Sequence, residues 1–148
     1  MGLFRKWKAN IIALFFLFLA LGIFYYEAWG KHLYIVTAYC NCPICVNVKE
    51  FHDGRFANGE RVNWGGIAAP KDMPFNTKIE LVPAWPFDFW KVHRILNDRT
   101  DFTVKDRGGK IRGRHFDLFI PDSMGGHKAA LRWGRQLMRV RINGKFAE

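Results

Sequence analysis

The most marked feature of the hydrophobic pattern is one uninterrupted apolar run near the amino terminus. Eighteen residues, 9–26, contain no charged side chain, and residues 11–26 are almost wholly apolar. A helix of this length is about long enough to cross a lipid bilayer. A helix packed in a soluble core usually keeps a polar stripe, and this run has none. The pattern therefore predicts a transmembrane helix within residues 1–30.

Charge beside this run predicts its orientation. Three basic residues precede it, Arg5, Lys6 and Lys8. Because basic flanks stay on the cytoplasmic side, we expect residues 1–30 to form a cytoplasmic tip and single-pass anchor in the cytoplasmic (inner) membrane. Residues 31–148 are then exported to the periplasm or cell wall. A cleaved signal peptide is the alternative. Cleavage after the small residues Ala20 and Gly22 would leave a strongly apolar new terminus, so the uncleaved anchor is favoured.

Beyond the anchor the pattern changes to short apolar segments separated by turn residues. Segments rich in β-branched and aromatic residues predict six or seven strands, at residues 33–39, 64–69, 77–82, 90–96, 102–105, 115–120 and 136–142. One short helix is expected, with Ser123 as its N-cap and Gly134 as its stop. Residues 40–63 are expected to be an irregular loop. Short strands with turns between them favour an all-β barrel or sandwich over a βαβ sheet.

Composition and charge limit the exported part further. The chain has 148 residues, 49% of them hydrophobic, which is enough for one compact domain besides the anchor. The formal net charge is +10, and residues 31–148 carry most of it. A basic surface suits nucleic acid, anionic lipid or an anionic wall polymer. Because an exported domain seldom meets nucleic acid, we expect no nucleic-acid partner.

Residues 102–120 carry the strongest chemical signal, in the form of strand, glycine loop and strand. Asp106 lies near the end of the first strand and Asp117 within the second. The two-residue period of a strand places these side chains on two faces: Phe116, Leu118 and Ile120 on one, and His115, Asp117 and Phe119 on the other. A carboxyl group in a cleft beside an aromatic ring is partly desolvated, which raises its pKa toward the range for proton transfer. The loop residues Gly108 and Gly109 lack a Cβ and would let the backbone approach a bulky sugar chain.

Each aspartate also has a purely structural interpretation. Asp106 directly precedes a glycine loop and suits a turn. Asp117 would suit an ion pair with Arg112 or Arg114. An aspartate between two apolar residues of a strand is disfavoured by strand propensity, so something besides folding is expected to retain it.

Six short motifs occur in order along residues 33–142, at residues 36–40, 66–70, 74–79, 105–113, 116–119 and 133–135. Together they resemble the 3D domain of bacteria, which is named for three aspartates and is related to the catalytic barrel of the MltA-type lytic transglycosylases. The resemblance covers nearly all of residues 33–142. It implies a six-stranded double-psi β-barrel for residues 31–148.

The resemblance also implies roles for individual residues. Asp117 becomes the catalytic acid and base, and Asp106 its close partner in the cleft. Thr37 and Tyr39 match polar positions that line this cleft. Asp72 is the third family aspartate, although the family places that acid directly after the paired alanines, where this chain has a proline.

The activity implied is that of a peptidoglycan lytic transglycosylase. Asp117 protonates the glycosidic oxygen between N-acetylmuramic acid and N-acetylglucosamine, then as carboxylate takes the proton from the muramyl C6 hydroxyl. That hydroxyl closes onto C1 and yields a 1,6-anhydro sugar. One acid suffices, so the paired carboxylates of ordinary glycosidases are not required. We expect the glycan strands of peptidoglycan as the partner, with no cofactor and no metal in the site.

A rival interpretation uses the same residues. Expansin-like double-psi barrels also carry a Phe-Asp-Leu strand with an upstream Thr-x-Tyr, and they bind or loosen wall polysaccharide without this cleavage. Residues 115–118 fit that pattern. The loop at residues 106–113 resembles the 3D and MltA-type sequence more closely, and this favours the enzyme over the non-catalytic binding module.

Three cysteines lie close together in the sequence, at Cys40, Cys42 and Cys45. In an oxidising compartment, one disulfide with a leftover thiol is the simplest outcome. A zinc site is the alternative, and it needs a fourth ligand, for which His52 is the nearest candidate. Two other histidines, His115 and His127, are expected to be surface or satisfied histidines.

Overall fold

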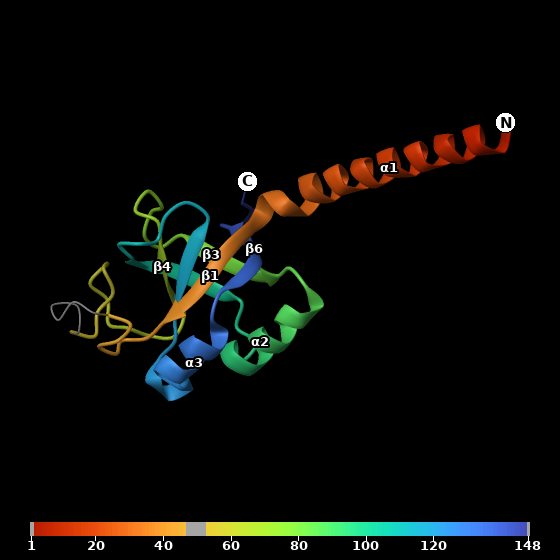
Figure 1. Cartoon of the computed structure of the whole chain (residues 1–148). Coiled ribbons are helices and arrows are strands. Elements are labelled where there is room, and N and C mark those ends of the chain that lie inside the picture. The colour runs from red at the N-terminus through yellow and green to blue at the C-terminus, as the bar shows by residue number, and fades with distance from the viewer. Residues whose placement is uncertain (1, 47–52, 148) are drawn as a thin grey trace. The chain divides into compact units, whose positions relative to one another are not determined.

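The computed structural model describes residues 2–46 and 53–147, and the chain divides into two compact units, Met1–Lys31 and His32–Glu148 (Figure 1). The first unit is dominated by helix α1 (Gly2–Trp29). Its window Asn10–Glu27 has a mean hydropathy of 1.9, so α1 is long and apolar enough to cross a membrane. A signal sequence has the same length and composition.

The second unit is mostly sheet. Its strands are β1 (Leu33–Tyr39), β2 (Gly66–Ala69), β3 (Lys78–Pro83), β4 (Asp101–Arg107), β5 (His115–Phe119), β6 (Gln136–Ile142) and β7 (Lys145–Phe146). Its helices are α2 (Pro86–Leu96) and α3 (Gly126–Trp133), with 3₁₀ turns η1 (Gly30–His32), shared with the first unit, and η3 (Asp122–Met124). Six of the predicted strands are therefore confirmed, and β1 and β6 have the predicted bounds.

The sheet closes on itself. The strand order is β1-β5-β2-β4-β3-β6-β7, and β6 also pairs with β1, so six strands form a ring to which β7 is added. The pairs β1–β5 and β2–β4 are parallel, and the others are antiparallel. A ring-like sheet agrees with the expected barrel, while its double-psi connection stays a prediction.

Alternate residues of the strands form the core. The innermost side chains come from most strands of the ring and are fully buried, among them Val36, Ile67, Leu81, Val104, Phe116, Leu118, Met138 and Val140. Helix α3 contributes Trp133, whose indole N–H donates to the carbonyl of Val36 at 3.1 Å. Burial of an aromatic ring with its polar atom bonded ties α3 firmly to β1.

The strand predicted at residues 90–96 is wrong, because this segment lies in helix α2. The helix begins with Pro86 at its first turn, a position where the missing N–H costs nothing. Asp88 accepts a hydrogen bond from the backbone N–H of Trp85 at 3.1 Å, which caps the start. Val92 and Leu96, spaced by one helical turn, are both buried. The apparent strand pattern is therefore one face of an amphipathic helix.

Helix α3 also starts later than predicted. Ser123 lies within η3, and the residue before α3 is Gly125, with φ 93°. The predicted stop is confirmed, since Gly134 ends the helix with φ 64°. A positive φ at both positions suits glycine.

Candidate functional site

Four side chains line up in register across four neighbouring strands. Thr37 of β1 pairs with Asp117 of β5, Asp117 pairs with Ala68 of β2, and Ala68 pairs with Asp106 of β4. Register partners on adjacent strands lie about 5 Å apart and face the same way. Only the methyl group of Ala68 therefore lies between the two aspartates. We refer to Thr37, Asp117, Ala68 and Asp106 as the acidic row.

A bulge in the β2–β4 pairing completes the row. Ile67 pairs with Val104, but the next residue, Ala68, pairs with Asp106, so Lys105 is skipped. Without the shift Lys105 would stand opposite Ala68, and the carboxyl group would turn to the other face. The sequence carries no signal for this bulge, although it brings the second aspartate to the first.

The acidic row faces away from the core. Phe116, Leu118 and Ile120 are fully buried, whereas His115 and Asp117 are only partly buried, as the strand period predicts. Phe119 lies on the face of Asp117 and is nevertheless 2% exposed, because the rings of Tyr39 and Phe56 pack on it with centroids 5.5 and 5.3 Å away. A small aromatic cluster thus covers this part of the outer face.

Asp117 is held by Thr37. The Thr37 hydroxyl donates to Oδ1 of Asp117 at 2.7 Å and lies 2.9 Å from Nε2 of His115. The hydroxyl has one proton, so when it donates to Asp117 it accepts from a protonated Nε2. Burial and the positive charge of Arg135 lower the pKa of His115, which keeps its ring neutral. His115 was expected to be an ordinary histidine, although its place two residues before Asp117 on the same face indicates a role in the site.

Burial raises the pKa of Asp117 from 3.8 to about 6. The hydrogen bond from Thr37 opposes this rise, and the negative charge of Asp106 adds to it. A carboxyl group with such a pKa exists in both forms near neutral pH, which is the property of a general acid and base.

Asp106 is surrounded by hydrogen-bond donors. Its Oδ1 accepts the backbone N–H groups of Ala57 at 3.0 Å and Arg107 at 2.8 Å, and its Oδ2 accepts the hydroxyl of Tyr39. Burial and the charges of Asp106 and Asp117 raise the pKa of Tyr39 well above its ordinary value, so Tyr39 stays a donor. Three donors suit a carboxylate, whose two oxygens both accept hydrogen bonds. Asp106 therefore accepts hydrogen bonds from two distant segments as well as from its own neighbour, and it is more than a turn aspartate.

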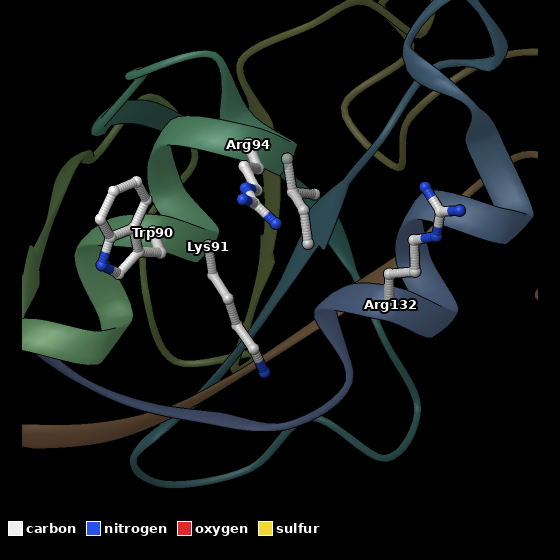
Figure 2. A pocket seen from close by; sticks show the side chains of 5 residues that line it. Trp90, Lys91, Arg94 and Arg132 are labelled. Atoms are coloured by element: carbon white, nitrogen blue, oxygen red, sulfur yellow. The ribbon is translucent and has the colours of Figure 1, made fainter.

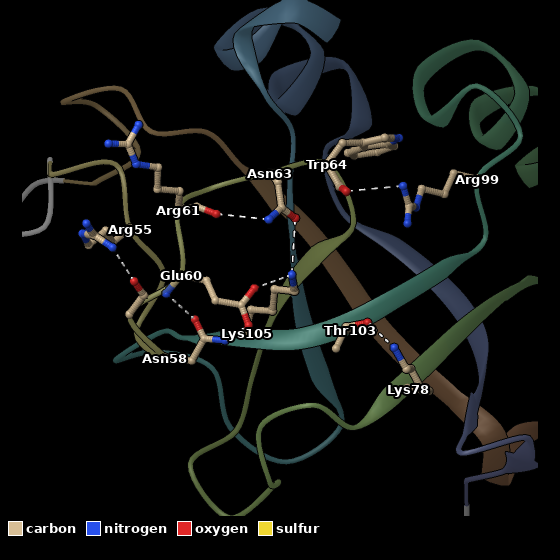
Figure 3. A network of polar contacts seen from close by, with 11 residues as sticks. Arg55, Asn58, Glu60, Arg61, Asn63, Trp64, Lys78, Arg99, Thr103 and Lys105 are labelled. Carbon is tan, nitrogen blue, oxygen red and sulfur yellow. Dashed lines mark hydrogen bonds and ion pairs between the residues drawn. The ribbon is translucent and has the colours of Figure 1, made fainter.

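The loop that supplies Ala57 is fastened to the outer side of β4 (Figure 3). Lys105 Nζ contacts Oε2 of Glu60 at 2.6 Å, and this contact lowers the pKa of Glu60. The carbonyl of Lys105 accepts the backbone N–H of Asn58 at 3.1 Å. These bonds hold the N–H of Ala57 at Asp106, a contact between residues 49 positions apart that sequence reasoning missed.

The third aspartate, Asp72, lies outside the acidic row. It is exposed in the turn after β2, and its charge acts on Arg107. Arg107 in turn donates to the carbonyl of Met73 and lies over the ring of Phe75, 4.0 Å from its centroid. Asp72 is therefore linked to the site through Arg107.

The two loop glycines differ from each other. A Cβ on Gly108 would lie 2.4 Å from Cγ1 of Ile111, so Gly108 makes room for that buried side chain. A Cβ on Gly109 would meet nothing within 4 Å. Approach of a sugar chain to these glycines stays a prediction.

The ion pair considered for Asp117 is not formed. Within residues 2–46 and 53–147, no basic side chain lies within salt-bridge distance of Asp117. Arg114 instead lies over the ring of Tyr34, 5.8 Å from its centroid.

A separate hollow of about 420 Å³ lies between α2 and α3 (Figure 2). Its lining residues are Trp90, Lys91, Arg94, Ile95 and Arg132. The guanidinium of Arg94 lies over the ring of Trp90, 5.9 Å from its centroid. This hollow offers positive charge and an aromatic ring, but none of its lining residues carries a carboxyl group.

No protein-family model and no curated protein matches the chain. Among solved structures, the chain is similar to the crystal structure of MltA from E. coli, with 20% identity and a TM-score of 0.38 over 60% of this chain and 26% of that one. It is also similar to a variant of the E. coli lytic transglycosylase MltA in an apo form, with 18% identity and a TM-score of 0.41 over the same shares. The chain thus spans about a quarter of the MltA chains it matches.

Proposed function

We propose that residues 31–148 act on the glycan strands of peptidoglycan as a lytic transglycosylase, with Asp117 as the single general acid and base. The observation that carries this proposal is the geometry of the acidic row, in which the partly buried Asp117 accepts a hydrogen bond from Thr37 and only Ala68 separates it from Asp106. Burial also raises the pKa of Asp117 to about 6. At this pKa the group gives up and regains a proton near neutral pH.

The first half of the reaction uses protonated Asp117. It donates its proton to the glycosidic oxygen, and the bond between that oxygen and C1 of N-acetylmuramic acid breaks. N-acetylglucosamine leaves with this proton as its 4-hydroxyl group. Positive charge then develops on the muramyl ring, and the carboxylate of Asp106, fixed by its three donors, is suited to stabilise it.

The second half uses the carboxylate form of Asp117. It takes the proton from the muramyl C6 hydroxyl while O6 bonds to C1, which gives the 1,6-anhydro sugar and returns Asp117 to its starting form. Thr37 orients the carboxyl group through its 2.7 Å hydrogen bond during both proton transfers. Each proton is accounted for, and no water attacks C1.

The setting of the domain supports the same substrate. We propose that α1 anchors the chain in the cytoplasmic membrane as a single pass and that the sheet domain lies in the periplasm or cell wall. Most of the net charge of +10 lies on residues 31–148, which suits a wall polymer whose peptide stems carry carboxylates. Gly109, with open space beside its Cα, is an approach point for the sugar chain.

The test is digestion of purified sacculi by the full chain in detergent micelles, with mass spectrometry of the released muropeptides. We expect anhydromuropeptides from the wild type and none above background from Asp117→Asn. Asp101→Asn is the matched control, because Asp101 lies on the same strand as Asp106 with its side chain 82% exposed. A wild-type chain that sediments with sacculi but releases no anhydromuropeptide would instead support an expansin-like binding module.

A further inference from the structure

Three cysteines and one histidine converge beside the end of β1. The ligand atoms of Cys40, Cys42, Cys45 and His127 all lie within 4.8 Å of one another. Cys40 directly follows β1, Cys42 and Cys45 lie in the loop after it, and His127 is the second residue of α3. Two segments far apart in the sequence therefore bring four metal-binding side chains together.

Three distances within this cluster are close to those between ligands of a tetrahedral zinc site. Sγ of Cys45 lies 3.5 Å from Sγ of Cys40 and 3.4 Å from Nδ1 of His127, and Sγ of Cys42 lies 3.6 Å from the same nitrogen. Zinc bonds of about 2.3 Å to sulfur and about 2.0 Å to nitrogen place neighbouring ligands about 3.5–3.8 Å apart. A disulfide needs sulfurs about 2.05 Å apart. The observed spacing fits a shared metal ion.

The backbone holds the ligands in place. The N–H groups of Cys45 and Val46 both donate to the carbonyl of Cys42, at 3.1 and 2.9 Å, which closes a tight turn and brings two thiols to one side. Cys40 is fully buried at the strand end. On the other side, α3 is fixed by Trp133, which is fully buried and bonded to β1.

We propose that Cys40, Cys42, Cys45 and His127 bind one Zn²⁺ as a closed structural site. Three thiolates and one imidazole are a ligand set that selects zinc. All four tetrahedral positions are filled by the protein, so no position is left for water or substrate and the ion has a structural role. Three sulfurs gathered this closely are also best accommodated as thiolates around a cation.

This assignment differs from the sequence expectations. A disulfide was the simplest outcome, and His52 was the nearest fourth ligand, but His52 lies outside the described residues. The fourth ligand is His127, which was expected to be an ordinary histidine.

The metal site adjoins the acidic row through the chain. Tyr39, which donates to Asp106, directly precedes Cys40, and its carbonyl accepts the N–H of Ile120 at 2.8 Å. Zinc therefore anchors the end of β1 from which Tyr39 reaches Asp106.

The zinc content of the purified full chain in detergent micelles, measured by inductively coupled plasma mass spectrometry, tests this proposal. We expect about one zinc per chain, and at least about tenfold less in His127→Ala and Cys42→Ser. His93→Ala is the matched control, because His93 is exposed and paired with Asp98. We expect this variant to keep the wild-type zinc content. Full zinc retention in His127→Ala would overturn the assignment.

A second measurement uses only the wild-type chain and so does not depend on how the variants fold. After chelation, addition of Co²⁺ is expected to produce thiolate-to-cobalt charge transfer and the intense visible absorption of tetrahedral cobalt. A metal-free chain whose intact mass is about 2 Da low, with one remaining thiol, would show a disulfide instead and would contradict the proposal.

Discussion

The hydroxyl of Thr37 donates a 2.7 Å hydrogen bond to Asp117, and the two residues are also register partners in the β1–β5 pairing. The contact is therefore built into the sheet. A proposed acid and base held by paired strands keeps its orientation better than one carried on a loop. His115, 2.9 Å from the same hydroxyl, supports Thr37 from its other side.

Replacing Thr37 by Val is expected to move the pH profile of activity to higher pH. The Thr37 hydrogen bond lowers the pKa of Asp117, so its loss raises that pKa. Because the first proton transfer needs protonated Asp117, the alkaline limb of kcat/KM, near pH 6 in the wild type, moves to higher pH. The check is anhydromuropeptide release across a pH series, with Thr37→Ser as the control that keeps the hydroxyl. An alkaline limb that moves to lower pH in Thr37→Val would contradict this role of Thr37.

Asp106→Asn is expected to shift the alkaline limb of kcat/KM in the direction opposite to the shift expected for Thr37→Val. The negative charge of Asp106 raises the pKa of Asp117, and a neutral amide removes this effect. The limb then moves to lower pH, by roughly one unit or less, since burial is the larger cause. Asp101→Asn, a change of the same kind on the same strand, leaves the profile in place. An alkaline limb at the same pH in Asp106→Asn and the wild type would rule out an electrostatic interaction between the two aspartates.

Asp117 is also expected to reduce stability at high pH. Its folded pKa of about 6 lies above the ordinary value of 3.8, so its contribution is fully present below the ordinary value and is lost as pH rises through about 6. By pH 8 or so the wild type loses up to about 3 kcal/mol of unfolding free energy from this group, and Asp117→Asn does not. Thermal unfolding of both chains in one detergent at several pH values gives the comparison. A pH-independent difference between them would show that Asp117 is not desolvated.

Local patterns predicted most of the strands but not α2. The bounds of β1 follow from its run of β-branched and aromatic residues, and the bounds of β6 were also predicted. Residues 90–96 of α2 were predicted to form a strand, although Pro86 and Asp88 already indicated a helix start. A short apolar run fits both periods, and only such end signals separate them.

The sequence predicted only part of the candidate site, because some of its contacts join segments that lie far apart in the chain. Strand period placed Asp117 opposite the core face, and the motif resemblance supplied Asp106, Thr37 and Tyr39. The donor at Ala57 and His127 of the cysteine cluster come from segments that are distant in the sequence and meet only in the folded chain. Long-range contacts of this kind leave no periodic trace in one sequence.

Membrane fractions offer a direct test of the anchor. If α1 stays attached, the full chain remains in carbonate-washed membranes, and its intact mass includes residues 1–30. The sheet domain is then reached by protease from the exported side. A soluble chain with a mass reduced by the apolar segment would show that α1 is a cleaved signal sequence.

Release of anhydromuropeptides from purified sacculi, compared between the full wild-type chain and Asp117→Asn, tests the role of Asp117 most directly. We expect release by the wild type and by Asp101→Asn, and a loss of at least about 100-fold in Asp117→Asn, the usual contribution of a general acid and base. Anhydromuropeptide release by Asp117→Asn at the wild-type rate would contradict Asp117 as the group that transfers the proton.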